Sequence, residues 1–436
     1  MARTITIRDF LGLNNVLPSE DLHIKENFKS VGYYLKRAKN IDIDNAKRPR
    51  RRRGYQTSLS GSDCHSLWSD GKICLYREGS YLKRLNDSLQ GSTTLRSDIQ
   101  GSLSMAYLSL DNKVYYSDGN ISGVIENGVS RSWGLPVPTT SPVLTSIPGG
   151  LLSGTYQVVY TYVRNDGQES GACETSLLSV TASQGIRIGS IVASPDTSVS
   201  KINVYLTRRD SEIFYKAYTL SNTSGQTIDF LSEDSLSGAM LKTQFLSPPP
   251  AGQILEYHNG RIFIGSFDVC WQTEPFKYEL CDLSNGYTQF ESDLTLIGAV
   301  DDGVYFGTDN EITFAQDNAQ LKAFKLDQKA DYGAIFGTMQ KVLRPDVGNN
   351  EAMQTLIVFA SVRGICIGGK GGEMINKSRD TYLYEPAYSG AGFVRKERGT
   401  DQYLFTLQGE DRDRQEMNLG YGDTEITLPI ATMDAE

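Results

Sequence analysis

The stretch "DDGVYFGTDN", residues 301–310, shows the pattern that decides the fold of this chain. Gly303 follows two acidic residues, an apolar strand comes next, and a second turn ends the strand. The same pattern recurs in "SDGKICLY" (69–76), "LDNKVYYSDG" (110–119), "HNGRIFIGS" (258–266) and "VRGICIGGKGG" (362–372). Short apolar runs bounded by glycine, asparagine and aspartate are typical of β-hairpins, so the chain is predicted to be built from hairpins.

The spacing of these hairpins predicts a β-propeller. The turn residue Gly71 precedes Asn112 by 41 residues, and Gly260 precedes Gly303 by 43. A four-stranded propeller blade occupies about 40 residues. The gap from Asn112 to Gly260 is 148 residues, which exceeds the period by about the length of one small domain. The gap from Gly303 to Gly364 is 61 residues.

A candidate insertion lies in the long gap, between the proline-rich segments "WGLPVPTTSP" (133–142) and "LSPPPAG" (246–252). Inside it, one set of residues alternates with another as in a half-buried strand: Tyr156, Val158, Tyr160 and Tyr162 with Gln157, Val159, Thr161 and Val163. Further on, "RRDS" (208–211) is typical of a hairpin turn. Roughly seven short strands without helix signals are typical of a fibronectin-type or immunoglobulin-like sandwich. We therefore predict a mainly β fold: a propeller of about five blades over 1–139 and 251–436, with a β-sandwich inserted at 140–250.

Composition narrows the function classes. The chain has 436 residues and a net charge of −9, whereas a protein that grips duplex DNA normally carries a basic footprint. The six cysteines are scattered without a CxxC pair, which favours free thiols in a reducing cytosol. No secretory signal is recognisable at the start, and no apolar run reaches the ~18 residues of a membrane span. We expect a soluble protein, made inside the cell, with no membrane contact.

Two segments resemble ligand-binding loops but lack the decisive residue. "GICIGGKG" (364–371) fits the start of a phosphate-binding loop, yet Gly371 stands where a magnesium-binding hydroxyl is needed. "DGNISG" (118–123) resembles the start of an EF-hand loop, but Val129 takes the place of the bidentate glutamate. We interpret the two segments as turns and expect no cofactor.

Catalytic and metal-binding patterns are equally weak. The three histidines lie in no HExxH or GxSxG context, and Cys64, His65 and Cys74 lack the tight spacing of a zinc site. Paired carboxylates could serve glycoside hydrolysis, which needs two of them at a fixed separation. Candidates are Asp301 with Asp302, and Glu410 with Asp411 and Asp413. Because acidic turns are common in propellers, we expect no enzyme, no catalytic residue and no bound metal.

The N-terminal segment resembles the signature of bacteriophage tail and virion proteins, which read Gly-Ile/Leu-Asn-Asn, then Ala-x-Asn-Val/Ile-Asp-Ile, a turn, and Arg-x-Gly-Tyr. The matching residues are Gly12, Leu13, Asn14, Asn15, Ala38, Asn40, Ile41, Asp42, Ile43, Arg53, Gly54 and Tyr55. "SGTYQVVYTYVRNDGQESGACE" and "PPPAGQILEYHNGRIFIGS" are also similar to those proteins, and the likeness extends over about residues 1–310. The chain departs from the signature at Asn45 and Ala46, where glycine is common, and its arginine run is heavier.

Within that group, the chain is most similar to the tail nozzle of short-tailed phages, the packaged-DNA stabilisation protein. The resemblance implies a homo-oligomeric ring, a hexamer, in the virion tail, assembled in the cytoplasm of the bacterial host. Such a ring extends the portal channel, retains packaged DNA and lets it exit during infection. The implied partners are head-to-tail adaptor or portal proteins, tail fibre or needle proteins, and double-stranded DNA in transit.

The densest charge of the chain lies in "KRPRRRR" (47–53), where six of seven residues are basic. We predict that "NIDID" is a strand, "NAKRP" a turn and "RRRGYQTS" the next strand. The run could be a charged edge that resists strand pairing, a contact to an acidic neighbouring subunit or ring, or a DNA contact. The candidate inter-ring contact residues are Arg48, Arg50, Arg51, Arg52 and Arg53.

A second function fits a propeller of a phage tail: binding of a host receptor or glycan through exposed aromatic side chains. Trp68, Trp133 and Trp271 are the candidates. They are fewer than the predicted blades, and each has a different local sequence. Glycan binding by the isolated protein would favour this alternative, and sixfold rings would favour the nozzle.

Overall fold

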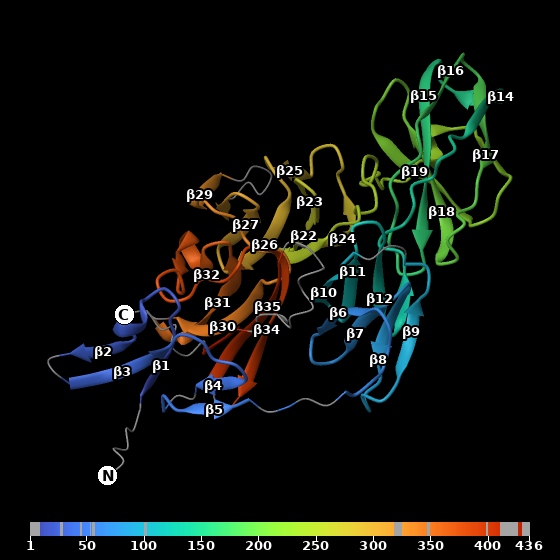
Figure 1. Ribbon diagram of the computed structural model, residues 1–436. Coiled ribbons are helices and arrows are strands. Elements are labelled where there is room, and N and C mark those ends of the chain that lie inside the picture. Colours follow the sequence, from blue (N-terminus) through green and yellow to red (C-terminus); the bar gives the residue numbers. More distant parts are fainter. Residues whose placement is uncertain are drawn as a thin grey trace, which may run out of the picture.

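The computed structural model describes residues 9–26, 29–43, 46–52, 54, 57–99, 103–317, 325–346, 349–397, 400–409 and 426–429. Its regular structure is almost entirely β. The helical elements of these residues are single 3-10 turns, at Ser19–Asp21, Glu233–Ser235 and Lys370–Gly372. Figure 1 shows a central body of small sheets, an N-terminal unit at its lower left and a separate extension at its upper right.

The five hairpins predicted from the repeated pattern are confirmed by strand register. In the clearest of them, His258 pairs with Arg261 across the turn from β21 to β22. Asn259 and Gly260 form this turn with φ values of 45° and 75°. Positive φ at both central residues defines the type I′ turn, whose twist matches that of the flanking strands. Local sequence therefore sets the hairpin positions.

Five sheets of the body share one up-and-down antiparallel order, and a shorter sheet follows them. The first sheet consists of β6 (Cys64–Ser69), β7 (Cys74–Glu78), β8 (Tyr81–Leu85) and β9 (Ser92–Arg96). The second consists of β10 (Ala106–Leu110), β11 (Lys113–Ser117), β12 (Ser122–Glu126) and β13 (Val129–Arg131). The third consists of β21 (Ile254–His258), β22 (Arg261–Ser266), β23 (Val269–Glu274) and β24 (Lys277–Cys281), with β25 (Tyr287–Gln289) on β23. The fourth consists of β26 (Leu294–Val300), β27 (Gly303–Thr308), β28 (Ile312–Gln316) and β29 (Leu326–Ala330). The fifth consists of β30 (Gln340–Asp346), β31 (Asn349–Ser361), β32 (Gly364–Gly368) and β33 (Met374–Asn376). The shorter sheet consists of β34 (Ala387–Glu397), β35 (Thr400–Gly409) and β36 (Ile426–Pro429).

Neighbouring sheets pack against each other through shared apolar cores. Leu75 and Leu82 of the first sheet meet Val114 and Tyr116 of the second, and similar clusters join each later pair. The second and third sheets share a core although more than a hundred residues separate them in the chain; Tyr115 belongs to it. Successive four-stranded meanders packed in this way form a β-propeller-like arrangement.

The chain between the second and third sheets forms seven strands in two further sheets. One contains β14 (Val143–Leu151), β17 (Gln184–Ile191) and β20 (Gln226–Phe230), and the other β15 (Gly154–Arg164), β16 (Ser176–Val180), β18 (Val199–Thr207) and β19 (Phe214–Ser221). Both sheets contribute to a single apolar core. In Figure 1 they form the extension at the upper right.

Strand β15 differs from the predicted alternation, because both of its faces are buried. Tyr160 is inaccessible, as expected, but so are Val159 and Thr161 of the opposite face. A loop covers that face through Glu169, whose carboxylate accepts hydrogen bonds from Thr161 and, at 2.8 Å, from the Tyr205 hydroxyl. The loop that directly follows β15 thus removes the solvent that the alternating pattern implied.

The N-terminal unit consists of a three-stranded sheet and a short hairpin. In the sheet, β3 (Lys29–Leu35) pairs in parallel with β1 (Phe10–Leu13) and antiparallel with β2 (His23–Glu26). The hairpin joins β4 (Ile41–Ile43) to β5 (Pro49–Arg51). The predicted "NIDID" strand is confirmed over Ile41–Ile43, but the second strand lies at Pro49–Arg51, earlier than the predicted 51–58, and Arg52, Gly54, Thr57 and Ser58 are outside any strand.

Candidate interaction site

The basic hairpin, defined as residues 41–52, is held to the last sheet by one carboxylate. Asp42 accepts a hydrogen bond from Arg52 Nε at 3.0 Å on one oxygen, and its other oxygen lies 3.1 Å from Arg395 Nη2 of β34. The Arg395 guanidinium also donates to Gln402 of β35. Side chains from both strands of a sheet thus fix the position of the hairpin.

The predicted contact arginines differ in their exposure. Arg48, Arg50 and Arg51 are exposed, whereas Arg52 is half-buried against Asp42. Arg53 lies outside the described residues. Arg52 therefore positions the hairpin, and the side chains of Arg48, Arg50 and Arg51 are accessible to solvent.

One asparagine of the N-terminal signature, Asn15, joins the N-terminal unit to the C-terminal half of the chain. The buried Asn14 caps its own turn, where its Oδ1 accepts from the backbone N–H groups of Val16 and Leu17. Asn15 reaches across 368 positions of sequence, donating to the Leu383 carbonyl at 2.6 Å and accepting from the Leu383 N–H at 2.8 Å. Asn15 therefore links the N-terminal unit to the segment that contains Leu383, and we call this pair of hydrogen bonds the N-terminal clasp.

A buried charge cluster connects the extension to the body and was missed by sequence reasoning. Glu279 of β24, 6% exposed, accepts two hydrogen bonds from Arg131 of β13 (2.6 and 3.0 Å) and two from Arg164 of β15 (2.9 and 3.0 Å). Burial opposes ionisation of Glu279, but the hydrogen bonds from the two guanidinium groups outweigh it and hold its pKa below the usual range. No local sequence signal marks three residues so distant in the chain.

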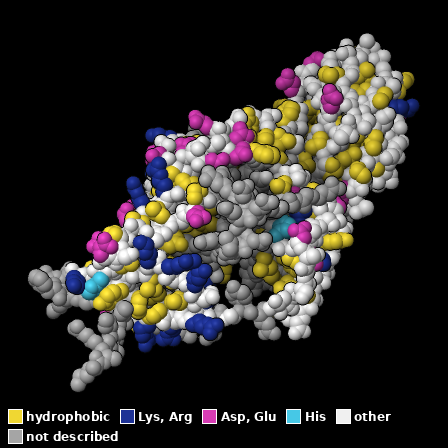
Figure 2. Space-filling model, viewed as in Figure 1, with side chains coloured by type: hydrophobic (Ala, Val, Ile, Leu, Met, Phe, Trp, Pro, Cys, Tyr) yellow, Lys and Arg dark blue, Asp and Glu magenta, His cyan; other side chains and the backbone are white. Residues whose placement is uncertain are grey.

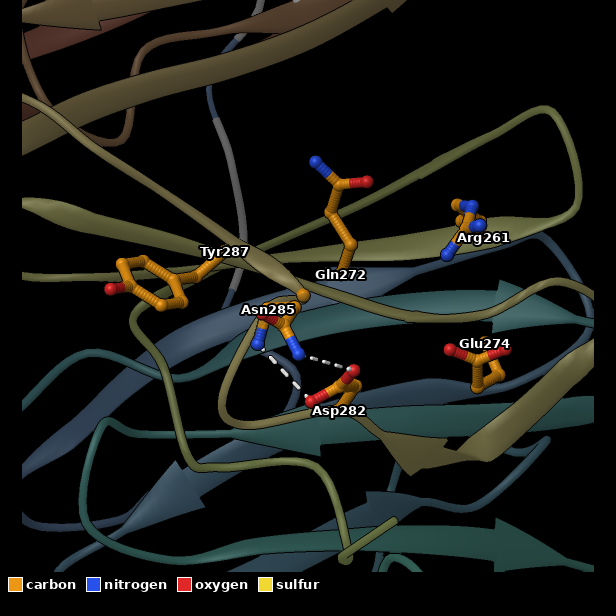
Figure 3. A pocket seen from close by; sticks show the side chains of 7 residues that line it. Arg261, Gln272, Glu274, Asp282, Asn285 and Tyr287 are labelled. Atoms are coloured by element: carbon orange, nitrogen blue, oxygen red, sulfur yellow. Dashed lines mark hydrogen bonds between the residues drawn. The ribbon is translucent and has the colours of Figure 1, made fainter. Parts of the chain in front are cut away.

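A small cavity lies beside β22 and β23, with Arg261 and Glu274 on one side and Gln272 and Tyr287 on the other (Figure 3). Its volume is about 10 Å³, room for one water molecule. Arg261 donates from Nη1 to the Thr273 carbonyl at 2.7 Å, while its Nε has no partner among the described residues. Burial lowers the pKa of Arg261. The cavity is too small for an organic substrate.

Both loop-like segments contain a turn, as predicted, but Gly364–Gly368 of the glycine-rich segment is strand β32. Asp118 Oδ1 accepts from the N–H groups of Asn120 (2.9 Å) and Ile121 (2.7 Å) and so closes its turn from within. In the glycine-rich segment, the Gly371 N–H donates to the Asp302 carboxylate at 2.9 Å. A side chain of the protein itself thus occupies the place an anion would take.

The other candidate groups have structural contacts. His65 bonds through Nδ1 to the Ser66 hydroxyl at 2.8 Å, and its pKa is lowered by burial and by the nearby Arg77 charge. Within the described ranges no group of three histidine, cysteine or carboxylate residues could hold a metal ion, and no cysteine forms a disulfide. Asp301 accepts from the Thr355 N–H at 3.2 Å, and the predicted group Glu410, Asp411 and Asp413 lies outside the described residues.

The tryptophans are less exposed than expected: Trp133 is buried, and Trp68 and Trp271 are half-buried. Trp133 is 2% exposed and donates from Nε1 to the Tyr278 carbonyl at 2.7 Å. Trp68 stacks on Tyr107 with 5.4 Å between ring centroids, and Trp271 lies 5.2 Å from Tyr287. These contacts between and within sheets cover part of the tryptophan ring surface on which a glycan would stack.

No helix among the described residues is long and apolar enough to cross a membrane. No family model matches the chain, and no curated protein does. Among solved structures it is similar to the N-terminal domain of Nup159 (TM-score 0.30, 11% identity, 78% of this chain and 72% of that chain). It is also similar to PorZ of the Porphyromonas gingivalis type-IX secretion system (TM-score 0.24, 12% identity, 83% and 54%) and to a KlHsv2 loop variant (0.25, 8%, 78% and 86%). We base no argument on likenesses this distant.

Proposed function

We propose that this chain is a structural subunit of a bacteriophage tail nozzle, a ring that extends the portal channel, retains packaged DNA and lets it exit during infection. The proposal rests on the contacts that residues of the phage-like signature make in the structure. Asn15 binds Leu383 and Asp42 binds Arg395, so the signature residues hold the N-terminal unit on the C-terminal sheet. A sequence pattern with such a role supports a shared architecture rather than a chance match.

We further propose that the five up-and-down sheets are the blades of a propeller and that the strands β14–β20 are an inserted β-sandwich. The shared core of the second and third sheets supports this assignment, because it makes them neighbours when the insertion is left out. Residues 140–250 expressed alone should then give the dispersed NMR spectrum of a folded module. A disordered fragment would contradict the insertion.

The charge distribution suits a conduit. The segment 36–53 carries nine basic and two acidic residues, so its net charge is +7 and the rest of the chain carries −16. A mostly acidic wall repels the phosphate backbone, so DNA can slide through without being held by tight contacts. A local basic surface on such a subunit then serves attachment to an acidic protein neighbour, either another subunit of the ring or an adjoining ring.

Negative-stain microscopy of the full chain, alone and with adaptor or portal proteins, tests the proposal. We expect sixfold rings that become more abundant when those partners are present, since subunits of net charge −9 repel one another at low salt. Phage lacking the protein should fill their heads and then release DNA. Null particles that keep their DNA and fail only at adsorption would overturn the nozzle in favour of receptor binding.

The hairpin is tested by Arg50→Ser with Arg51→Ser, two exposed arginines whose loss leaves the Arg52 contact to Asp42 intact. Attachment to a neighbouring subunit or ring should weaken more than affinity for duplex DNA. Lys36→Ser with Arg37→Ser is the matched control, because both residues are exposed and remove the same charge outside the hairpin. Equal losses in both variants would indicate a general charge effect.

A further inference from the structure

An acidic surface lies on the opposite side of the body from the basic hairpin. Glu291 and Asp293 are exposed in the connection between β25 and β26, and Asp309 is exposed directly after β27. We call these three residues the acidic edge. The segment 291–311 around them contains six carboxylates and no lysine or arginine.

The acidic edge is not neutralised within the described part of the chain. No lysine or arginine there forms an ion pair with Asp293 or Asp309. Leu294 pairs with Thr308 between β26 and β27, which places Asp293 beside Asp309, and partial burial and the neighbouring charge of Asp293 raise the pKa of Asp309. Two carboxylates that repel each other without a cation form a surface that a guanidinium group would stabilise.

The acidic edge and the basic hairpin are too far apart to meet within one copy. In Figure 1, β4 and β5 lie at the bottom of the body, and β25 and β29 lie at its top. Figure 2 shows carboxylate side chains along the upper margin of this face, near β25, with lysine and arginine side chains to their left and more of them toward the lower end. A molecule with complementary charge at two separate sites can associate head to tail, and such heterologous contacts generate rings when the rotation closes.

We propose that the basic hairpin of one copy, through Arg50 and Arg51, docks on the acidic edge of a second copy of this chain. The inference rests on the proposed ring and names the surfaces that would form it. Arginine suits the contact because its planar guanidinium pairs with carboxylates through two hydrogen bonds. DNA is disfavoured as the occupant, because its phosphates would approach an otherwise acidic molecule.

Charge reversal on each surface tests the contact. One variant carries Arg50→Glu and Arg51→Glu, and the other carries Asp293→Lys and Asp309→Lys. Sedimentation should show that either variant alone loses at least ~10-fold in association constant, because like charges then face each other. A mixture of the two variants should recover association, since each contact again joins opposite charges. Circular dichroism checks that both variants are folded.

Three results would overturn the inference. The first is wild-type protein that stays monomeric at concentrations of about 1 mM, where even weak association is detectable. The second is a mixture of reversed variants that associates no better than either alone. The third is a hairpin variant that self-associates as the wild type does but loses affinity for a DNA duplex, which would assign the hairpin to nucleic acid.

Microscopy separates this inference from the proposed function. Rings that persist in both reversed variants would refute the named surfaces and leave the nozzle standing. Wild-type protein that forms no ring with any adaptor or portal protein would refute the nozzle, even if the reversed variants still paired in solution.

Discussion

Replacing Glu279 with glutamine should loosen the attachment of the extension to the body. The carboxylate accepts four hydrogen bonds, two from Arg131 and two from Arg164, at 2.6 to 3.0 Å. An amide has one oxygen, so its NH₂ group would face guanidinium donors, and Arg131 and Arg164 would each keep only one carboxylate partner, Glu126 and Asp166. Removing one partner of a buried ion pair costs about 3 to 5 kcal/mol, and we expect a loss near the lower limit because glutamine keeps the shape.

Urea denaturation followed by tryptophan fluorescence measures this loss, since the buried Trp133 is bonded to Tyr278, directly before Glu279. The matched control is Asp166→Asn, which removes an Arg164 partner that is 47% exposed. An exposed pair contributes at most about 1 kcal/mol, so the control should unfold near the wild-type midpoint.

The pH dependence gives an independent check. The pKa of Glu279 is lower in the folded protein than its ordinary value of 4.5, so its stabilising effect is present above that value and lost as pH falls through the folded pKa. The stability difference between wild type and Glu279→Gln should therefore shrink in acid. A variant within about 0.5 kcal/mol of wild type at pH 7 would refute the reasoning, since that is the range of ordinary surface substitutions.

Three further changes probe other parts of the fold. Asn15→Ala removes the hydrogen bonds of the N-terminal clasp and should cost about 1 to 3 kcal/mol, measured as faster amide exchange in the N-terminal unit with no change in the extension. A thiol reagent at pH 8 should label the exposed Cys64 first and Cys173 only on unfolding, because burial raises the pKa of Cys173 to about 11; rapid labelling of Cys173 in folded protein would contradict the packing. Gly260→Ala should destabilise the β21–β22 hairpin by more than about 1 kcal/mol in thermal unfolding, because its φ is +75° and the added Cβ would lie 2.7 Å from the Phe276 ring. The control Gly71→Ala has a φ of +83° but open space around it, so a loss as large as that of Gly260→Ala would show that the ring contact is unimportant.

Local patterns predicted most of the strands. Turn residues such as Asn259 and Gly260 fix hairpins because few other residues adopt positive φ at low cost, and this preference depends only on neighbours in sequence. The same local logic identified Asp118 as a turn former. The basic run could also be read directly from the sequence, because its charge depends only on which residues are present.

The sequence by itself determined the hairpin positions, the mainly β character and the opposite signs of the 36–53 segment and the rest of the chain. Only the tertiary structure decided which distant residues meet: Glu279 with Arg131 and Arg164, and Asn15 with Leu383. It also buried the second face of β15 and the ring of Trp133, which local patterning left open to solvent. The physical reason is the separation along the chain over which each effect acts. Preferences in φ and strand periodicity act over a few residues, whereas burial and ion pairing depend on surfaces that meet only when the whole chain has folded.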